Sequence, residues 1–319
     1  MAKVAFIFPG QGSQKVGMGH DLYHSFAAAR EVFKTADEVL GFPLSRLCFE
    51  GPEVELNQTI NAQPALVTAS LATLVAIQEV NAGSKLENPA FVAGHSLGEY
   101  TALAAAGVFD SATAIYLALQ RGRLMHEAGL NRPGGMAAVI GLDEAQLAEV
   151  CHQTGTQIAN YNCPGQLVIS GATEHLTKAM ALVKSRGAHR VIPLVVSGAF
   201  HTPLMESAAQ GMSDVLSTLS FNGPLIKVVA NTTAKVLTTA EEVKAELLSQ
   251  LCRGVQWQRS VEYMINKGVA TFVEIGPGNV LTGLIKRINR NVAALSVGDA
   301  TAVRNFSRLI SLNFYKEVV

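Results

Sequence analysis

Residues 90–100 read Ala90-Phe-Val-Ala-Gly94-His-Ser96-Leu-Gly98-Glu-Tyr100, and an Ala- and Leu-rich stretch continues from 101 to 108. A short apolar run thus leads to a serine between two glycines. This order predicts a nucleophile elbow, in which a strand delivers the serine to a sharp turn. The next helix then directs free N–H groups at the negative charge that develops beside the hydroxyl. Our leading hypothesis is acyl transfer through an ester of Ser96, and the alternative is an ordinary strand-to-helix turn with a solvated serine.

The size and composition of the chain indicate a compact, enzyme-like protein. Its 319 residues exceed the usual size of one domain, which favours either one large domain with an insertion or two domains. Hydrophobic residues make up 49% and charged residues only 16%, so the chain is not of the disordered class. The 25 basic and 25 acidic residues cancel, and the overall charge therefore favours no binding of nucleic acid.

The four cysteines, at positions 48, 151, 163 and 252, show neither Cys-x-x-Cys spacing nor clustered histidines. We therefore expect no metal site and no disulfide framework, but buried free thiols in a reducing cytosol. The apolar run Val4 to Phe8 is too short for a signal peptide or a membrane span. A cytoplasmic protein without a membrane segment is the expectation.

Alternating strand-like and helix-like runs predict an α/β fold. The middle of the chain has its own order, βαββαβ, which is typical of a ferredoxin-like unit. Its elements are expected at 136–142, 144–152, 157–160, 166–170, 174–186 and 190–196. We predict a large α/β-hydrolase-like domain (1–130 and 198–319) with this ferredoxin-like subdomain inserted (131–197). The active site would lie in the cleft between them.

A nucleophilic serine needs a base, and His201 is the candidate because it follows the last strand of the inserted unit, where the chain re-enters the large domain. His95, next to the serine, should point away from it at a tight turn. None of the six aspartates stands in a loop suited to orient His201. A full triad therefore stays open beside a dyad, in which a backbone or amide oxygen, for example from residues 250–257, orients the imidazole.

Two further positions could face the cleft. Gln11 lies in the Gly-punctuated loop after the strand Val4 to Phe8, where its amide could close an oxyanion hole; otherwise it is an exposed glutamine in a tight connection. Arg121 lies in the predicted helix from 111 to 127, with Met125 on the apolar face. Helical arginines are normally solvated. An arginine that faced the cleft, however, could bind a carboxylate through two N–H donors of its planar guanidinium. This possibility favours an acid-bearing acyl group as the ligand.

Six segments, taken in order, resemble the malonyl-CoA:acyl-carrier-protein transacylases of fatty acid synthesis, over residues 4 to about 290. They are Phe8-Pro-Gly-Gln-Gly-Ser13, Gly94-His-Ser-Leu-Gly-Glu-Tyr100, Gln120-Arg-Gly-Arg123, Asn160-Tyr-Asn-Cys-Pro-Gly-Gln166, Gly198-Ala-Phe-His201 and Glu274-Ile-Gly-Pro-Gly278. The resemblance implies a ping-pong reaction, in which malonyl passes from coenzyme A to the enzyme and then to the phosphopantetheine thiol of acyl carrier protein. It implies no bound cofactor or metal, with the coenzyme A thioester as substrate, and a monomer is the default.

The resemblance also implies roles for individual residues. Ser96 becomes the nucleophile and His201 the acid and base. The remaining catalytic positions are Gln11 and the N–H of Leu97 as oxyanion donors, and the main-chain carbonyl of Gln250, which orients the histidine. The substrate-binding positions are Arg121, as partner of the malonyl carboxylate, with Asn160, Asn162, Phe200 and Met125. The sequence Gly-Ala-Phe-His looks like the malonyl-selecting form of this loop, where bulk leaves little room for an α-methyl group.

Two parts of the chain depart from the family or go beyond it. Cys252-Arg-Gly254 lacks the proline common there, and the tail after Asp299 matches nothing that can be transferred. The helix-like run from 281 to 290 buries an apolar stripe and leaves a basic ridge that could dock an acidic carrier protein. The ridge comprises Lys286, Arg287 and Arg290. A solvated face is the alternative.

Two other functions remain as alternatives. A serine esterase or thioesterase would use the same elbow and let water release the acyl group. Against it stand the absence of a His-Gly-Gly loop and of an Asp-Gly pair. A carrier-binding scaffold with a degraded site is the second alternative, and it conflicts with the presence of Ser96, His201, Gln11 and Arg121 together.

Overall fold

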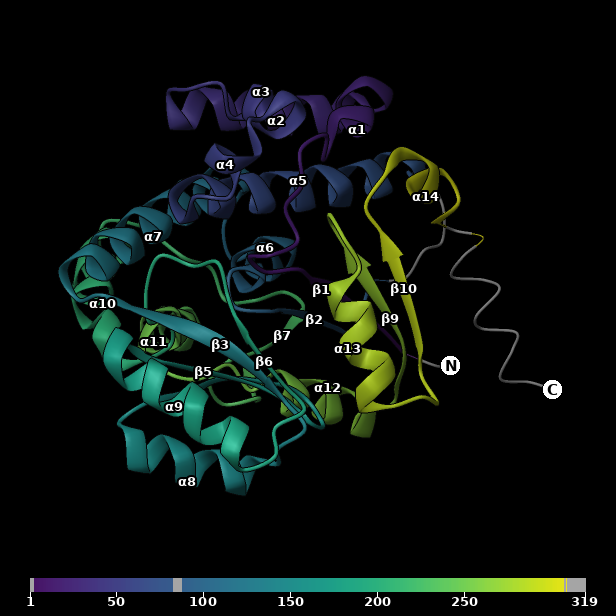
Figure 1. Ribbon diagram of the computed structural model, residues 1–319. Helices are drawn as coiled ribbons and strands as arrows, with labels where there is room; N and C mark the ends of the chain where they lie inside the picture. Colours follow the sequence, from purple (N-terminus) through teal and green to yellow (C-terminus); the bar gives the residue numbers. More distant parts are fainter. Residues whose placement is uncertain (1–2, 83–87, 307, 309–319) are drawn as a thin grey trace.

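The computed structural model describes residues 3–82, 88–306 and 308, and its strands form two sheets (Figure 1). The larger sheet has the order β10-β9-β1-β2-β7-β8. Its strands are β1 (Lys3–Phe8), β2 (Phe91–Gly94), β7 (Lys227–Val229), β8 (Val236–Leu237), β9 (Val269–Ile275) and β10 (Ala293–Val297). All neighbours pair in parallel except β7 and β8. The mixed α/β class predicted from the sequence is confirmed.

Helices cover both faces of the larger sheet because its central strands are apolar on both sides. In β1, Phe6 and Phe8 pack into one core, while Ala5 and Ile7 pack into another. The helices outside the smaller sheet's unit are α1 (His20–Ser25), α2 (Ala27–Leu40), α3 (Leu44–Glu50), α4 (Glu53–Leu56), α5 (Thr59–Val80), α6 (Gly98–Ala105), α7 (Ser111–Asn131), α10 (Glu206–Ser217), α11 (Ala240–Cys252), α12 (Trp257–Asn266), α13 (Val280–Ile288) and α14 (Ala300–Arg304), with a 3₁₀ turn at Pro203–Met205.

Helix α5 is the one described helix that is long and apolar enough to cross a membrane. Within the protein, however, 83% of its most apolar window is buried. It lies along one side of the molecule between α2 and the sheet (Figure 1). Its hydropathy is thus accounted for by packing in the core.

The smaller sheet and the two helices that pack on it are the elements that the sequence predicted between 136 and 196, in the same order. They are β3 (Gly134–Ile140), α8 (Glu144–Thr154), β4 (Gln157–Cys163), β5 (Gln166–Ala172), α9 (Thr173–Ser185) and β6 (Arg190–Pro193). The strands pair antiparallel in the order β4-β5-β3-β6, and α8 and α9 lie side by side against one face (Figure 1). Asp143 caps α8 through a capping box with Gln146.

Two boundaries in this unit differ by three residues from the sequence-based prediction, and the others agree within two residues. Strand β4 continues to Cys163, with register shifts on the way, instead of ending at Asn160. Strand β6 ends at Pro193 instead of Val196, because a turn follows, in which the N–H of Val196 donates to the carbonyl of Leu194. Within β4, Asn160 also forms an isolated parallel bridge with Val255, which lies between α11 and α12.

The register of the parallel pair β1 and β2 positions the site. Phe8 pairs with Gly94, so both strands end at the same edge of the sheet. The loop at 9–12 and the turn at Ser96 therefore lie together at the carboxyl edge, where α/β sheets bind ligands.

Candidate active site

The turn between β2 and α6 has the geometry of a nucleophile elbow. Ser96 has a φ of 50°, in the left-handed region that non-glycine residues rarely adopt. A Cβ at Gly94 would lie 1.9 Å from the carbonyl carbon of Gly98, and a Cβ at Gly98 would lie 2.1 Å from the oxygen of Phe8. Both glycines are thus required by close backbone approach.

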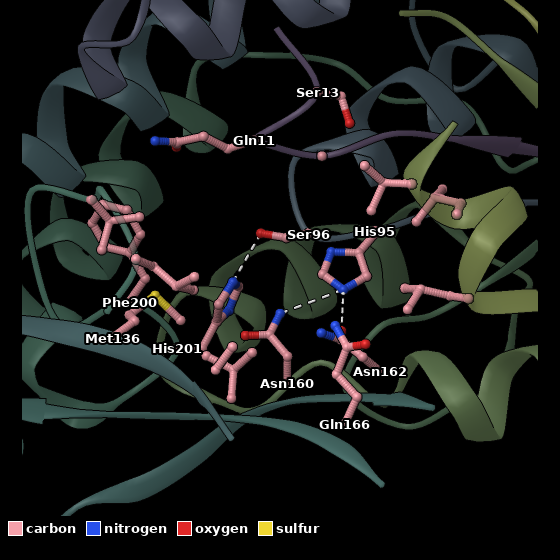
Figure 2. A pocket seen from close by; sticks show the side chains of 18 of the residues that line it. Gln11, Ser13, His95, Ser96, Met136, Asn160, Asn162, Gln166, Phe200 and His201 are labelled. Atoms are coloured by element: carbon pink, nitrogen blue, oxygen red, sulfur yellow. Dashed lines mark hydrogen bonds between the residues drawn. The ribbon is translucent and has the colours of Figure 1, made fainter. Parts of the chain in front are cut away.

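His201 contacts the serine, and a main-chain carbonyl orients it. The His201 Nε2 and Ser96 Oγ atoms are 2.8 Å apart, and His201 Nδ1 lies 2.7 Å from the carbonyl oxygen of Gln250 (Figure 2). A carbonyl only accepts hydrogen bonds, so Nδ1 carries the hydrogen and Nε2 is free to accept from the hydroxyl. Among the described residues, no carboxylate hydrogen-bonds this imidazole, which makes the arrangement a dyad.

The surroundings keep His201 neutral. The residue is 3% exposed. Burial, and then the positive charge of Arg121, lower the pKa of His201 to about 3. The imidazole is therefore available as a base throughout the neutral pH range.

Arg121 faces the serine and is not solvated. Its side chain is buried, and its Nη2 donates to Ser96 Oγ at 3.1 Å and to Gln250 Oε1 at 2.8 Å. Its Nη1 donates to Gln63 Oε1 at 2.9 Å. Arg123, on the same helix, is exposed beside Glu127. Of these two arginines, only Arg121 can therefore meet a ligand bound beside Ser96.

A pocket of about 240 Å³ opens beside Ser96 between the two sheets. Eight of the residues selected from the sequence line it: Gln11, Ser96, Arg121, Met125, Asn160, Asn162, Phe200 and His201. The sequence reasoning missed the apolar part of the pocket wall on β3 and β5, which comprises Met136, Ala138 and Val168. Alternation along β3 and β5 is the signal that could have found them, because every second residue of a strand faces the same side.

His95 points away from Ser96, as expected, but into the same pocket. Its Nε2 lies 2.8 Å from Asn162 Oδ1, and Asn160 lies on the same side (Figure 2). Its ring packs near Trp257, with 5.6 Å between the ring centroids. His95 therefore belongs to the wall of the pocket and fixes an asparagine.

The side chain of Gln11 does not point where the sequence reasoning placed it. Its Nε2 donates to Thr59 Oγ1 at 3.2 Å, and Figure 2 shows the amide directed away from the serine. The main-chain N–H groups of Gln11 and Leu97, in contrast, have no hydrogen-bond partner in the described part of the chain. Two unpaired N–H groups at the carboxyl edge are the donors that an oxyanion needs.

The basic ridge is only partly as predicted. Leu281, Leu284 and Ile285 are buried, whereas Lys286, Arg287 and Arg290 are exposed. Helix α13 ends at Ile288, so Arg290 lies beyond it and not on the same helical face. Arg287 donates to Gln166 Oε1 at 2.6 Å, which ties α13 to the smaller sheet. The freely exposed cations of the ridge are therefore Lys286 and Arg290.

The four cysteines are free; Cys48, Cys151 and Cys163 are buried and Cys252 is half-buried. Burial raises the pKa of each thiol. Over residues 3–82, 88–306 and 308, no three His, Cys, Asp or Glu side chains are arranged to hold a metal ion. Residues 309–319 of the tail lie outside the described residues.

Residues 5–308 match the family model of the acyl transferase domain. The chain belongs to this family. Two similar acyl transferases are the malonyl CoA-acyl carrier protein transacylases of Bacillus subtilis (strain 168) and Escherichia coli (strain K12). The Bacillus subtilis protein is 44% identical over 308 residues, which cover 95% of this chain and 96% of that protein. The Escherichia coli protein is 44% identical over 307 residues, which cover 95% of this chain and 98% of that protein. The resemblance stated from the six sequence segments is confirmed.

Solved acyl transferase structures superpose on nearly all of the chain. The acyl carrier protein S-malonyltransferase of Vibrio cholerae superposes with a TM-score of 0.91 at 41% identity, covering 96% of this chain and 100% of that one. A malonyl-transacylase in complex with a type II polyketide acyl-carrier protein superposes with a TM-score of 0.90 at 40% identity, covering 95% and 98%.

Proposed function

We propose that the protein transfers a malonyl group from malonyl-CoA to the phosphopantetheine thiol of acyl carrier protein, in fatty acid biosynthesis. The observation that carries the proposal is the buried Arg121 guanidinium, 3.1 Å from the hydroxyl of Ser96. A planar cation at this place pairs with a carboxylate on the acyl group that the serine receives. The names of the similar acyl transferases support the same substrate and acceptor.

The first half-reaction loads the serine. His201 Nε2 takes the hydroxyl proton while Ser96 Oγ attacks the thioester carbonyl, and the main-chain N–H groups of Leu97 and Gln11 stabilise the oxyanion. The tetrahedral intermediate collapses, the C–S bond breaks, and the coenzyme A sulfur leaves with the proton held by His201. The malonyl ester of Ser96 remains.

The second half-reaction repeats these steps with another thiol. His201 takes the proton of the phosphopantetheine thiol, and the sulfur attacks the ester carbonyl. Ser96 Oγ leaves with the proton returned from His201, so the enzyme is regenerated. The same oxyanion donors serve both steps, because both pass through a tetrahedral carbon at the same place.

The walls of the pocket support a small, acid-bearing acyl group. Phe200 and Met125 provide apolar surface near the reacting atoms, and bulk at Phe200 disfavours an α-methyl substituent. Asn160 and Asn162 offer amide groups on the side of the smaller sheet, where the arm of the thioester can enter. The acyl group would thus lie with its carboxylate on Arg121.

The intact mass of the protein after incubation with malonyl-CoA tests the proposal. We expect one malonyl adduct on wild-type protein and none on Ser96→Ala. Addition of an acceptor thiol should discharge the adduct. A full adduct on the variant would rule out the serine ester.

The same experiment distinguishes the alternatives. An esterase or thioesterase would lose the adduct to water without an acceptor, whereas a carrier-binding scaffold would form none. The buried guanidinium favours the transferase, because neither alternative needs a cation that pairs with an acyl carboxylate.

We also propose a division of the fold into a large α/β-hydrolase-like domain (1–130 and 198–319) and an inserted ferredoxin-like subdomain (131–197). The antiparallel order β4-β5-β3-β6 and the helices α8 and α9 support the second description. Balanced charge and free cysteines support a cytoplasmic protein, with no cofactor beyond the coenzyme A thioester and no membrane or nucleic acid partner. A monomer is the simplest assembly, since one chain supplies every site residue; sedimentation tests it.

A further inference from the structure

Both main-chain polar groups of Ser96 are held by side-chain amides. Its N–H donates to Asn231 Oδ1 at 2.7 Å, and its carbonyl accepts from Gln250 Nε2 at 3.0 Å. Asn231 follows β7 by two residues, and Gln250 lies in the last turn of α11. A left-handed φ at a non-glycine residue persists only where its surroundings enforce it, and these two bonds do so at the reacting residue.

One buried carboxylate orients both amides. Glu99 Oε1 accepts from the main-chain N–H of Asn231 at 2.8 Å and from its Nδ2 at 2.9 Å. The other oxygen, Oε2, accepts from Gln250 Nε2 at 2.5 Å. The Asn231 Nδ2 also donates to the carbonyl of Gly94 at 2.7 Å. Since every partner of Glu99 is a donor, neither amide can flip without placing oxygen against oxygen.

We propose that Glu99 and Asn231 are positioning residues for the reaction at Ser96. Asn231 fixes the strained elbow through the serine N–H, which leaves the next N–H, that of Leu97, free for the oxyanion. Glu99 fixes Asn231 and, through its second oxygen, the amide of Gln250. The inference rests on the proposed function only in taking Ser96 as the nucleophile.

The second arm of this network ends on Arg121. With Gln250 Nε2 turned toward Glu99, Gln250 Oε1 faces the guanidinium and accepts from its Nη2 at 2.8 Å. The orientation of one amide thus decides whether Arg121 has an acceptor or a donor beside it. Asn231 has no hydrogen bond to Gln250 or Arg121 among the described contacts, so the two arms can be separated by mutation.

The first experiment measures the reactivity of the serine alone. The probe is a neutral fluorophosphonate, which carries no carboxylate for Arg121 and needs no carrier protein. We expect Asn231→Ala to slow the modification of Ser96 by roughly 10- to 100-fold, because small displacements of reacting groups have effects of this size. The matched control is Glu274→Gln, which changes a carboxylate that is also fully buried and accepts N–H bonds from Leu281 and Thr282. It should lower the melting temperature and leave the modification rate of the folded protein unchanged.

The second experiment compares malonyl and acetyl transfer. In Glu99→Gln, the single amide oxygen best serves the two donors of Asn231, so its NH₂ group meets Gln250 and turns that amide over. Arg121 then loses an acceptor, and we expect the malonyl-to-acetyl rate ratio to fall roughly tenfold, as for the loss of one hydrogen bond to a charged group. Asn231→Ala should lower both rates and leave the ratio unchanged.

Opposite results overturn the inference. Folded Asn231→Ala that reacts with the fluorophosphonate at the wild-type rate removes the positioning role of Asn231, and an unchanged ratio in Glu99→Gln removes that of Glu99. If Asn231→Ala does not fold, Asn231→Asp keeps the side-chain volume and replaces the Nδ2 donor by an oxygen that faces Glu99. The fluorophosphonate should modify this variant as slowly as Asn231→Ala. Modification at the wild-type rate would again overturn the positioning role of Asn231. A wild-type protein that the reagent does not modify at Ser96 would instead contradict the proposed function itself.

Discussion

The guanidinium of Arg121 and the hydroxyl of Ser96 are 3.1 Å apart, although the residues are 25 positions apart in the sequence. Arg121 lies in α7, whereas Ser96 lies in the turn between β2 and α6. The arginine is buried, and its described hydrogen-bond partners are the neutral groups of Gln63, Gln250 and Ser96. No carboxylate among these partners neutralises the guanidinium, so its positive charge acts on a group bound in the pocket and on His201. Substrate choice and the state of the base are thus linked through one side chain.

Removal of this cation should affect acid-bearing substrates most. We expect Arg121→Ala to weaken malonyl transfer by roughly 2–5 kcal/mol, because the bound carboxylate loses its paired charge. Acetyl transfer should fall less. The measurement is kcat/KM for both thioesters, and Arg123→Ala, an exposed arginine of the same helix, is the control. Equal losses for the two substrates would make Arg121 a structural residue.

The pH dependence of loading should reflect the neutral state of His201. A histidine ordinarily titrates at about 6.5, but here burial and Arg121 lower the pKa to about 3. Because the folded-state pKa is below the usual value, the base stays unprotonated as pH falls through 6. Single-turnover loading of wild-type protein should therefore show no loss centred at about pH 6.5.

Arg121→Gln provides the comparison for this pH profile. It removes the second of the two main causes and leaves burial, so the pKa of His201 should rise and an acid-side loss of loading should move up in pH. A profile identical to that of wild type would show that the charge of Arg121 does not reach the imidazole.

The side chain of Gln11 should matter little to the rate. Its amide donates to Thr59, and the proposed oxyanion donor is its main-chain N–H, which every non-proline residue carries. We expect Gln11→Ala and Thr59→Val to change the loading rate by less than a few-fold. A loss of roughly 10²-fold in Gln11→Ala alone would return the role to the amide.

The sequence predicts those parts of the site whose geometry depends on residues close together in the chain. Gly94 and Gly98 flank the serine because any Cβ there would collide with neighbouring backbone, so the pattern itself carries the geometry. The elements of the smaller sheet follow from apolar periodicity and from the capping residue Asp143. His201 could be placed near the cleft because it follows the last strand of that unit.

The parts that the sequence could not predict depend on contacts between distant segments. Glu99 and Asn231 are 132 residues apart, and nothing in either segment marks the partner. The carbonyl that orients His201 belongs to Gln250 but exists at every residue, so residue type gives no signal; the resemblance supplied it. The side-chain amide of Gln11 points away from the serine because it donates a hydrogen bond to Thr59 Oγ1. The loop sequence does not reveal this partner.

Two exposed cations at the C-terminal end of α13 form the proposed docking surface for the carrier protein. Lys286 and Arg290 are exposed and line one hollow beside α13 and β10. Arg287, in contrast, donates a hydrogen bond to Gln166. The pocket beside Ser96 includes Val280, Leu281 and Leu284 of the same helix, so a partner that contacts these cations lies next to the entrance. Acyl carrier proteins are typically acidic, and a local basic patch attracts them through a field that salt weakens.

We therefore expect Lys286→Glu with Arg290→Glu to raise the KM for the carrier protein, more at low salt than at high salt, because the field changes sign where the partner approaches. Loading from malonyl-CoA should be nearly unchanged, since neither residue lines the pocket. The matched control is Lys178→Glu with Lys184→Glu on α9, which makes the same charge change at exposed positions of another helix. If this control raises the KM equally, net charge alone is responsible. If the first pair slows loading as much as transfer, these residues act on the coenzyme A substrate instead of on the docking of its acceptor.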